Sequence, residues 1–323
     1  MQAVVFEGAG GNEVVHLRER PDPVPQGTEV VVAVRHAGLN PADVLQRRGH
    51  YPAPPGSPTD IPGLEVAGEV VVVGERVRRW QPGDRVFGIV GGGGLASRVL
   101  VEESNLAAVP AALDDAEAAA VPEAFLTAHD ALRTQAGLRP GEWVVVQGAT
   151  GGVGTAALQV AAACGARTIG VTRSAEGRDL IASLGAEPVD DFDVVEQVRG
   201  VTGGAGADVV VELVGAPKVP ADLEMLATGG RIVVVGVGAG SKVEIPLLAL
   251  MGRRARLIGT VLRARPVPEK AAVVAAFERE VLPHLADGRV HPIVDTIYPA
   301  DAVHDAFDHL EAPGKAGKLL LEF

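Results

Sequence analysis

WVVVQGATGGVG, residues 143–154, is the stretch of the sequence that decides the fold. Four apolar residues of strand length lead into a run of small residues, and an Ala-rich helical segment follows as far as Cys164. Small residues let the backbone turn sharply and approach a pyrophosphate, and the next helix offers unpaired N–H groups and the positive end of its dipole. This order of strand, loop and helix predicts a dinucleotide site. The loop residues expected to bind the cofactor are Thr150, Gly151, Gly152, Val153 and Gly154.

The segment around this loop, from residue 121 to 262, alternates strand, glycine, helix and strand. Such alternation predicts a doubly wound parallel sheet of the Rossmann type. The strands that we expect there span residues 143–147, 167–172, 208–214 and 231–237.

The two ends of the chain follow other patterns. Residues 1–120 hold short β runs separated by Pro and Gly, which is typical of an antiparallel barrel or sandwich. Residues 263–323 hold a helical pattern at 270–285 and later a strand, a helix and a strand. These are too few elements for a third core, so we expect this segment to return to the first domain. The expected fold class is α/β.

Composition and charge narrow the class of protein. With 323 residues the chain suits two domains. Its 41 acidic and 29 basic residues leave a net charge of -12, which disfavours a nucleic-acid partner. The single cysteine excludes an intramolecular disulfide. No signal peptide is expected at the N-terminus, and no apolar stretch approaches the ~20 residues of a membrane span. We therefore expect a cytoplasmic protein with no membrane partner.

The end of the second expected strand bears on which dinucleotide binds. NAD-specific sites usually place an acidic residue there, against the ribose 2′-hydroxyl. This sequence has Thr172, Arg173 and Ser174 instead, with Arg178 one turn later. Arginine and hydroxyl groups attract a 2′-phosphate, which a carboxylate would repel. NADPH is therefore the favoured cofactor, and the alternative is that Arg173 is a solvated loop charge.

Four motifs together resemble the medium-chain dehydrogenase/reductase superfamily, and within it the zinc-independent quinone oxidoreductases that include zeta-crystallin. They are AGLNPAD at 37–43, PGLEVAGEV at 62–70, PGDRV at 82–86 and the loop at 148–154. The resemblance covers essentially the whole chain and implies a GroES-like first domain. The stretch QRRGHYPAPPG at 46–56, with Ile293–Tyr298, looks most like the branch that contains the animal apoptosis-linked quinone oxidoreductase.

Zinc-dependent relatives differ from this chain at two ligand positions. They have a Cys where Asn40 stands and a His where Leu64 stands; Asn is a poor zinc ligand and Leu is none. His304 and His309 are five residues apart, off the i, i+4 face, and are interpreted as a solvated helix surface. We therefore expect no metal.

The resemblance also implies roles for individual residues. Asn40 and Tyr51 are the candidate catalytic residues, placed beside the nicotinamide and in contact with the substrate oxygen. Tyr51 could donate a proton through water; the alternative is that its ring packs against neighbouring prolines. The branch commonly has a Lys where Gly177 stands and a Tyr near Phe192, so Arg173 or Arg178 would have to hold the phosphate. The further cofactor-binding candidates are Thr127, Phe192, Gly236, Val237, Gly238, Leu262 and Lys318.

The expected reaction follows from the missing metal. Without a Lewis acid, the acceptor should itself be electrophilic, as quinones and conjugated carbonyls are. The leading hypothesis is NADPH-dependent quinone reduction. An enoyl or 2-alkenal reductase is the alternative, and it would need an acid such as Tyr51 because a carbon must be protonated. A hypothesis of another class is a low-turnover NADPH-binding structural or RNA-binding protein, which the acidic balance disfavours. From the resemblance alone we expect a homodimer through edge strands near residues 231–237 and 256–261.

Overall fold

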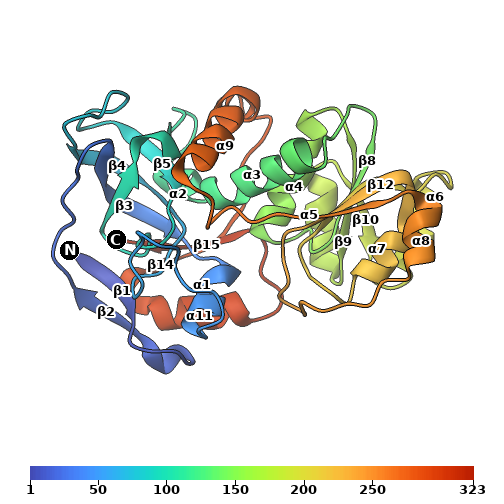
Figure 1. Cartoon of the computed structure of the whole chain (residues 1–323), viewed down its shortest axis with the longest axis horizontal. Helices are drawn as coiled ribbons and strands as arrows, with labels where there is room; N and C mark the ends of the chain where they lie inside the picture. The colour runs from blue at the N-terminus through green and yellow to red at the C-terminus, as the bar shows by residue number, and fades with distance from the viewer. The chain divides into compact units, whose positions relative to one another are not determined.

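The computed structural model describes residues 1–323 and divides the chain into two compact units. Unit 1 contains Met1–Leu126 together with Leu262–Phe323, and unit 2 contains Thr127–Val261. The first boundary lies at residue 126 rather than 120, inside helix α3 (Pro122–His129). In Figure 1 the C-terminal strands β14 (Val294–Pro299) and β15 (Lys318–Glu322) lie beside strands formed by the first hundred residues.

Unit 1 is built on a seven-stranded, mainly antiparallel sheet with the strand order β14-β15-β3-β4-β5-β7, and β6 also pairs with β3. A separate two-stranded ribbon joins β1 and β2. The strands from the first part of the chain are β1 (Gln2–Phe6), β2 (Val15–Glu19), β3 (Glu29–Gly38), β4 (Glu65–Val73), β5 (Arg85–Ile89), β6 (Arg98–Glu102) and β7 (Leu106–Ala108). These observations agree with the antiparallel arrangement expected from the short β runs.

Within unit 1, aromatic contacts join the C-terminal segment to the N-terminal part of the chain. Phe307 packs edge-on against Phe6 with ring centroids 5.9 Å apart, and Phe277 packs against Phe87 at 6.1 Å. Both C-terminal rings are fully buried, so their packing contributes hydrophobic stabilisation that the segment could not gain alone. The helical elements of unit 1 are η1 (Asn12–Val14), α1 (Pro41–Arg47), η2 (Glu103–Asn105), α2 (Asp115–Ala119), α9 (Val267–Glu280), α10 (Leu282–Ala286), η4 (Ala300–Ala302) and α11 (Val303–Glu311).

Unit 2 is a six-stranded sheet in which every neighbouring pair is parallel, with the order β10-β9-β8-β11-β12-β13. Helix α4 lies on one side of this sheet, and α7 and α8 lie on the other (Figure 1). Its elements are the π-helical turn η3 (Asp130–Gln135), β8 (Trp143–Val146), α4 (Gly152–Ala163), β9 (Arg167–Thr172), α5 (Ala175–Ser183), β10 (Glu187–Asp190), α6 (Val194–Val201), β11 (Ala207–Glu212), α7 (Val219–Met225), β12 (Leu226–Val234), α8 (Leu247–Arg253) and β13 (Arg256–Gly259). This arrangement confirms the expected α/β fold class with a doubly wound sheet.

Two elements differ from their expected bounds for identifiable reasons. The helix expected at 270–285 is two helices, because Pro283 has no N–H to continue α9, which ends at Glu280. Strand β12 begins at Leu226, five residues before the expected Arg231, and contains Gly229 and Gly230. Glycine lowers strand propensity, so the sequence pattern did not indicate the first half of this strand.

Candidate cofactor and acceptor sites

The glycine loop of unit 2 joins the carboxyl end of β8 to the N-terminus of α4. Gly148 has a φ of +67°, which few residues other than glycine adopt. A Cβ on Gly154 would lie 2.5 Å from the Gly148 carbonyl oxygen and 2.7 Å from the Ala149 carbonyl carbon, so this position has room only for glycine. At Gly151 an added Cβ would meet nothing nearer than 3.8 Å. The loop thus has one glycine packed against backbone and another that faces open space.

Helix α4 presents its N-terminus directly after this open position. Gly151 is its N-cap, no acidic residue occupies its first turn, and its 12 residues give it an ordinary helix dipole. Of the other predicted residues, Thr150 lies in the turn just before this N-cap, and Gly152 and Val153 begin the helix. The arrangement fits an anion such as a dinucleotide pyrophosphate, held by backbone N–H groups.

The strand order reverses between β8 and β11, which are neighbours in space, while β9 and β12 lie on opposite sides of that pair. Ligands of open α/β sheets bind at the carboxyl ends of strands at such a reversal. The loop after β11 is held there by the buried Glu212, whose Oε1 accepts hydrogen bonds from the backbone N–H groups of Val214 at 2.5 Å and Gly215 at 2.7 Å. Glu212 was not among the residues predicted from the sequence, although an acidic residue at the end of an otherwise apolar strand is a recognisable pattern.

The predicted residues after β12 line the same edge of the sheet. A Cβ on Gly236 would lie 2.2 Å from the Leu213 carbonyl oxygen, whereas one on Gly238 would meet no atom within 4 Å. Val237 between them is 44 % exposed. Gly236 therefore allows two neighbouring loops to pack closely, whereas Val237 and Gly238 face open space.

The residues expected to hold the 2′-phosphate lie at the end of β9 and the start of α5. Ser174 caps α5 by accepting a hydrogen bond from the Gly177 N–H at 2.9 Å. A Cβ on Gly177 would lie 2.3 Å from the buried Thr172 hydroxyl oxygen, so the lysine common in relatives would not fit here without rearrangement. The structure thus gives a packing reason for that departure from the family pattern.

The two predicted arginines differ in availability. Arg173 is exposed and forms no ion pair or side-chain hydrogen bond, whereas Arg178 donates to Asp190 across 2.8 Å. Phe192, beyond Asp190, is 76 % exposed. Arg173 is therefore the cation free to meet a phosphate, since Arg178 already has a carboxylate partner.

Three further cofactor candidates have side chains buried in this structure. Thr127 in unit 2 is buried, and its hydroxyl oxygen has no hydrogen-bond partner. Such an unsatisfied group is costly unless something else supplies the bond, which fits a ligand contact. Leu262 and Lys318 are buried in unit 1.

The structure gives Lys318 a role other than the predicted cofactor contact. Its ammonium group contacts the Glu65 carboxylate at 2.5 Å and donates to the Asn40 Oδ1 at 2.6 Å and the Leu39 carbonyl at 2.9 Å. An ammonium group has three N–H donors, and all three are used. Lys318 is therefore the counter-ion of a buried carboxylate.

Asn40 is held in the same cluster. Its amide nitrogen donates to Glu65 at 2.9 Å and to the Gly38 carbonyl at 3.3 Å, while its oxygen accepts from Lys318. Both amide donors are thus engaged, and only one lone pair of the oxygen is left. The predicted contact between Asn40 and a substrate oxygen would require one of these donors to change partner.

Two more carboxyl groups belong to this buried cluster. Asp43 accepts from the N–H groups of Asn40 and Gly63, yet burial raises its pKa to about 6. Burial, and then the charge of Glu65, raise the pKa of Glu123 to about 7. Asp43 and Glu65 lie within quoted motifs, but sequence analysis did not recognise them as one charged cluster.

Tyr51 is half-buried in unit 1 beside Arg263. The Arg263 guanidinium lies 5.1 Å from the centre of the Tyr51 ring and donates to its carbonyl oxygen at 3.2 Å. Burial raises the pKa of the Tyr51 hydroxyl, which therefore keeps its proton at neutral pH. The Arg263 guanidinium over the ring therefore helps to fix this side chain.

Comparison with known proteins identifies the family. The profile described as "Alcohol dehydrogenase GroES-like domain" matches residues 26–111, and the one described as "Zinc-binding dehydrogenase" matches residues 152–279. The quinone oxidoreductase of Lama guanicoe is 33 % identical over 99 % of this chain and 97 % of its own. This chain belongs to the quinone oxidoreductase family of medium-chain dehydrogenases/reductases. Unit 1 is accordingly its GroES-like part.

Two solved structures, of a quinone oxidoreductase and of an enoyl reductase, are similar to this chain over its whole length. The quinone oxidoreductase from Thermus thermophilus, whose structures include a complex with NADPH, has a TM-score of 0.86 and 36 % identity, with complete coverage of both chains. The CurK enoyl reductase has a TM-score of 0.85 and 26 % identity over 99 % of this chain and 98 % of its own.

The name of one matching profile refers to zinc, but the residues that stand at two zinc-ligand positions of zinc-dependent relatives, Asn40 and Leu64, do not suit zinc in this member of the quinone oxidoreductase family. Leu64 is fully buried and has no donor atom, and the Asn40 amide is engaged as described. The structure contains no group of three or more His, Cys, Asp or Glu side chains arranged to hold a metal ion. It also contains no helix long and apolar enough to cross a membrane.

Proposed function

We propose that this chain is an NADPH-dependent, zinc-independent reductase of quinones. Its relatives of 31–33 % identity are named quinone oxidoreductases, and the Thermus thermophilus relative forms a complex with NADPH. The observation that carries the proposal is the pair Asn40 and Leu64, which leaves no metal to polarise an unactivated carbonyl. Because a single cysteine excludes an internal disulfide, we place the reaction in the cytoplasm.

The chain's own residues position the reactants and supply a proton. Bound NADPH would supply the hydride. Tyr51 holds a proton on its hydroxyl at neutral pH and can donate a hydrogen bond to the acceptor oxygen. Arg263 holds the Tyr51 ring and carbonyl in place, so the hydroxyl does not need to be ordered when an acceptor arrives.

Replacing Tyr51 by phenylalanine tests this mechanism. We expect Tyr51→Phe to lower turnover of quinones by about tenfold or more, because the hydrogen bond to the developing oxygen charge is lost. The only other tyrosine, Tyr298, bonds to His309 at 2.9 Å and provides the matched control Tyr298→Phe, which should behave like wild type. Unchanged turnover of every acceptor by Tyr51→Phe would remove Tyr51 from the mechanism.

The unpartnered Arg173 is proposed to select NADPH over NADH. Arg173→Ala should weaken NADPH binding by about tenfold while NADH binding stays the same, since only NADPH carries the 2′-phosphate. The exposed Arg139 precedes the amino end of β8, at the opposite edge of the sheet, and Arg139→Ala serves as the control. Fluorescence titration of both nucleotides measures the effect, and equal affinities unchanged by Arg173→Ala would contradict the assignment.

Reduction of α,β-unsaturated carbonyls is the second candidate. It is favoured by the likeness to the CurK enoyl reductase and by a protonated Tyr51, because this reaction must protonate a carbon. A panel of quinones, 2-alkenals and enoyl thioesters separates the two. If only the last two classes turn over, the enoyl reductase hypothesis replaces the quinone one.

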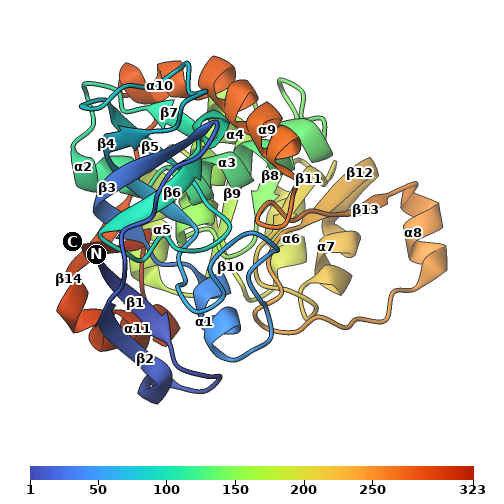
Figure 2. The same ribbon diagram turned by 60° about the vertical axis from the view of Figure 1, so that its left-hand side comes forward.

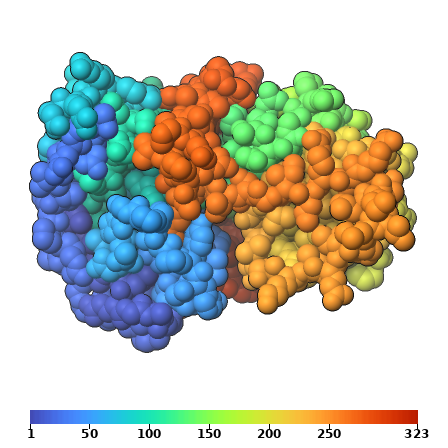
Figure 3. All heavy atoms as spheres, in the orientation of Figure 1, coloured from blue at the N-terminus to red at the C-terminus, as the bar shows by residue number.

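We also propose a homodimer formed through β13, the edge strand of the unit 2 sheet. An edge strand offers unpaired N–H and C=O groups to a second copy. Apolar side chains are uncovered beside it on α8, a segment that lies at the surface of unit 2 (orange in Figure 3): Leu248 is 82 % exposed, and Leu247 and Met251 are each 68 % exposed. Such a patch is typical of a protein interface.

A further inference from the structure

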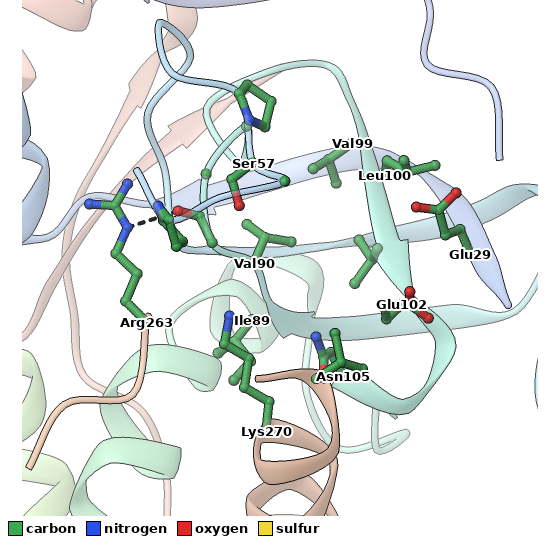
Figure 4. Close-up of a pocket in the computed structure, with 18 of the residues that line it drawn as sticks. Glu29, Ser57, Ile89, Val90, Val99, Leu100, Glu102, Asn105, Arg263 and Lys270 are labelled. Atoms are coloured by element: carbon green, nitrogen blue, oxygen red, sulfur yellow. Dashed lines mark hydrogen bonds between the residues drawn. The ribbon is translucent and has the colours of Figure 1, made fainter. Parts of the chain in front are cut away.

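Unit 1 contains a cavity of about 800 Å³. Its walls come from the proline-rich loop at residues 54–58, the end of β5 with the following glycines, strand β6 and the start of α9 (Figure 4). Ile89, Val90 and Val99 give it an apolar lining. Neither Asn40 nor Tyr51 lines it.

A buried lysine without a partner lies in this cavity. Lys270 is only 7 % exposed, and its ammonium group forms no hydrogen bond and no ion pair. Burial lowers its pKa, while the more distant charge of Glu123 acts in the opposite direction. Burying a charge without a direct partner is costly. Lys270 also occupies the first turns of α9, where the helix dipole disfavours a cation.

Asn105 is a second unsatisfied group on the same wall. It is 6 % exposed, its side chain forms no hydrogen bond, and its Oδ1 is fully buried. Figure 4 shows Asn105 and Lys270 rising from the same side of the cavity, with their nitrogen atoms toward its interior. The wall therefore holds an ammonium group that has no acceptor, on Lys270, and an amide whose buried oxygen has no donor, on Asn105.

The other polar groups of the cavity indicate where a ligand charge would lie. Arg263 is already committed, to Gly91, Tyr51 and Gln46. Glu29 and Glu102 also line the cavity, and Figure 4 shows Glu102 close to Asn105 on the side away from Lys270, where an anion would be repelled. A negative group would therefore lie on the Lys270 side of Asn105, away from both carboxylates.

We propose that this cavity binds a small apolar carboxylic acid as its carboxylate. The carboxylate accepts hydrogen bonds from the Lys270 ammonium and the Asn105 amide, and the apolar body packs against Ile89, Val90 and Val99. Charge-assisted bonds of this kind are stronger than neutral ones, and the ligand supplies an acceptor for the Lys270 ammonium and for the Asn105 amide N–H groups. The inference does not depend on the proposed quinone reduction, because neither Lys270 nor Asn105 has a role in that reaction.

Benzoate is a suitable probe, and benzamide has the same shape without the charge. By calorimetry with the full chain, we expect benzoate to bind at least about tenfold more tightly than benzamide. Lys270→Met and Asn105→Leu should each weaken benzoate by about tenfold or more, whereas Lys270→Arg should retain part of the binding. Lys315→Met, at a half-buried lysine of the same unit, provides the control and should bind like wild type.

Two outcomes would overturn the proposal. One is benzoate that does not bind, or binds no better than benzamide. The other is benzoate that binds Lys270→Met as it binds wild type. A lysine that serves only to offset Glu123 would give the second result, and the loss of stability in Lys270→Met would then be recovered by adding Glu123→Gln. Because no nucleotide or quinone is used, failure here leaves the proposed reductase activity standing.

Discussion

Glu65 shows how a buried charge organises its neighbours. Its carboxylate is fully buried and accepts from Asn40, from Lys318 and, at 2.8 Å, from the Glu123 N–H. A Cβ on Gly38 would lie 2.2 Å from its Oε1, so glycine at that position makes room for it. Removing one partner of such a cluster leaves an uncompensated charge, which costs more than the pair contributes. The charge of Glu65 is also one reason why the pKa of the nearby Glu123 carboxyl is raised to about 7.

Glu123 should make the protein less stable as the pH rises. Its folded pKa of about 7 exceeds the ordinary value of 4.5, so the folded state holds the proton more tightly than the unfolded chain. This stability is fully present below about pH 4.5 and is lost as the pH rises through about 7. When the pH rises from about 5 to about 8, the free energy of unfolding of the wild type should therefore fall by roughly 2 kcal/mol more than that of Glu123→Gln.

Denaturant titrations at several pH values measure this difference. The exposed Glu269 of the same unit provides the control, and Glu269→Gln should follow the wild-type curve. Parallel curves for wild type and Glu123→Gln would show that the buried carboxyl does not govern the pH response.

Two glycines at the junction of β8 with α4 have different structural roles. Gly154 lets the helix approach the strand closely, and Gly151 leaves space in front of the helix N-terminus. The two functions are distinguishable because a methyl group would strike backbone at one position and nothing at the other.

Alanine substitutions at these two positions should therefore separate folding from cofactor binding. Gly154→Ala should lower the free energy of unfolding by more than about 1 kcal/mol, because backbone must move. Gly151→Ala should unfold like wild type, since its φ of −74° suits alanine, but it should bind NADPH at least about tenfold more weakly because the methyl group occupies the pyrophosphate position. Thermal unfolding with and without NADPH measures both. Normal NADPH binding by Gly151→Ala would place the pyrophosphate elsewhere.

The exposed surface of α8 and β13 bears on how the whole molecule associates. In Figure 2 α8 projects from the end of the unit 2 sheet near β13. Leu257 on β13 and Val261 after it are also exposed, by 43 % and 51 %. Single exposed apolar residues are common, but three on one short helix, as on α8, are not.

Charges placed on this surface should prevent association. We expect the wild-type chain to sediment as a dimer and the double variant Leu248→Asp/Met251→Asp as a monomer, because two carboxylates per copy would be buried unpaired in the interface. Val24 in unit 1 is 76 % exposed, and Val24→Asp is the control. A monomeric wild type at micromolar concentration would refute the proposed dimer.

Local patterns were sufficient for much of this protein. The strands β8 and β9 follow from apolar runs with clear boundaries, and the cofactor loop follows from small residues between a strand and a helix. The absence of zinc ligands follows from residue types alone, at Asn40 and Leu64. In each case the physical cause lies within a dozen residues, so the sequence contains it.

Only the tertiary structure decided which side chains meet. Lys318 contacts Asn40 across 278 positions of sequence, and no local pattern indicates that its three donors are used there rather than on a cofactor. The same holds for Lys270 and Asn105, whose lack of partners is a property of the packed cavity. The hydrogen bonds and charges of buried groups depend on burial and on distant segments, whereas the backbone elements depend on neighbours in the chain. The glycine loop at residues 143–154 was therefore predictable from the sequence, and the buried cluster around Glu65 was not.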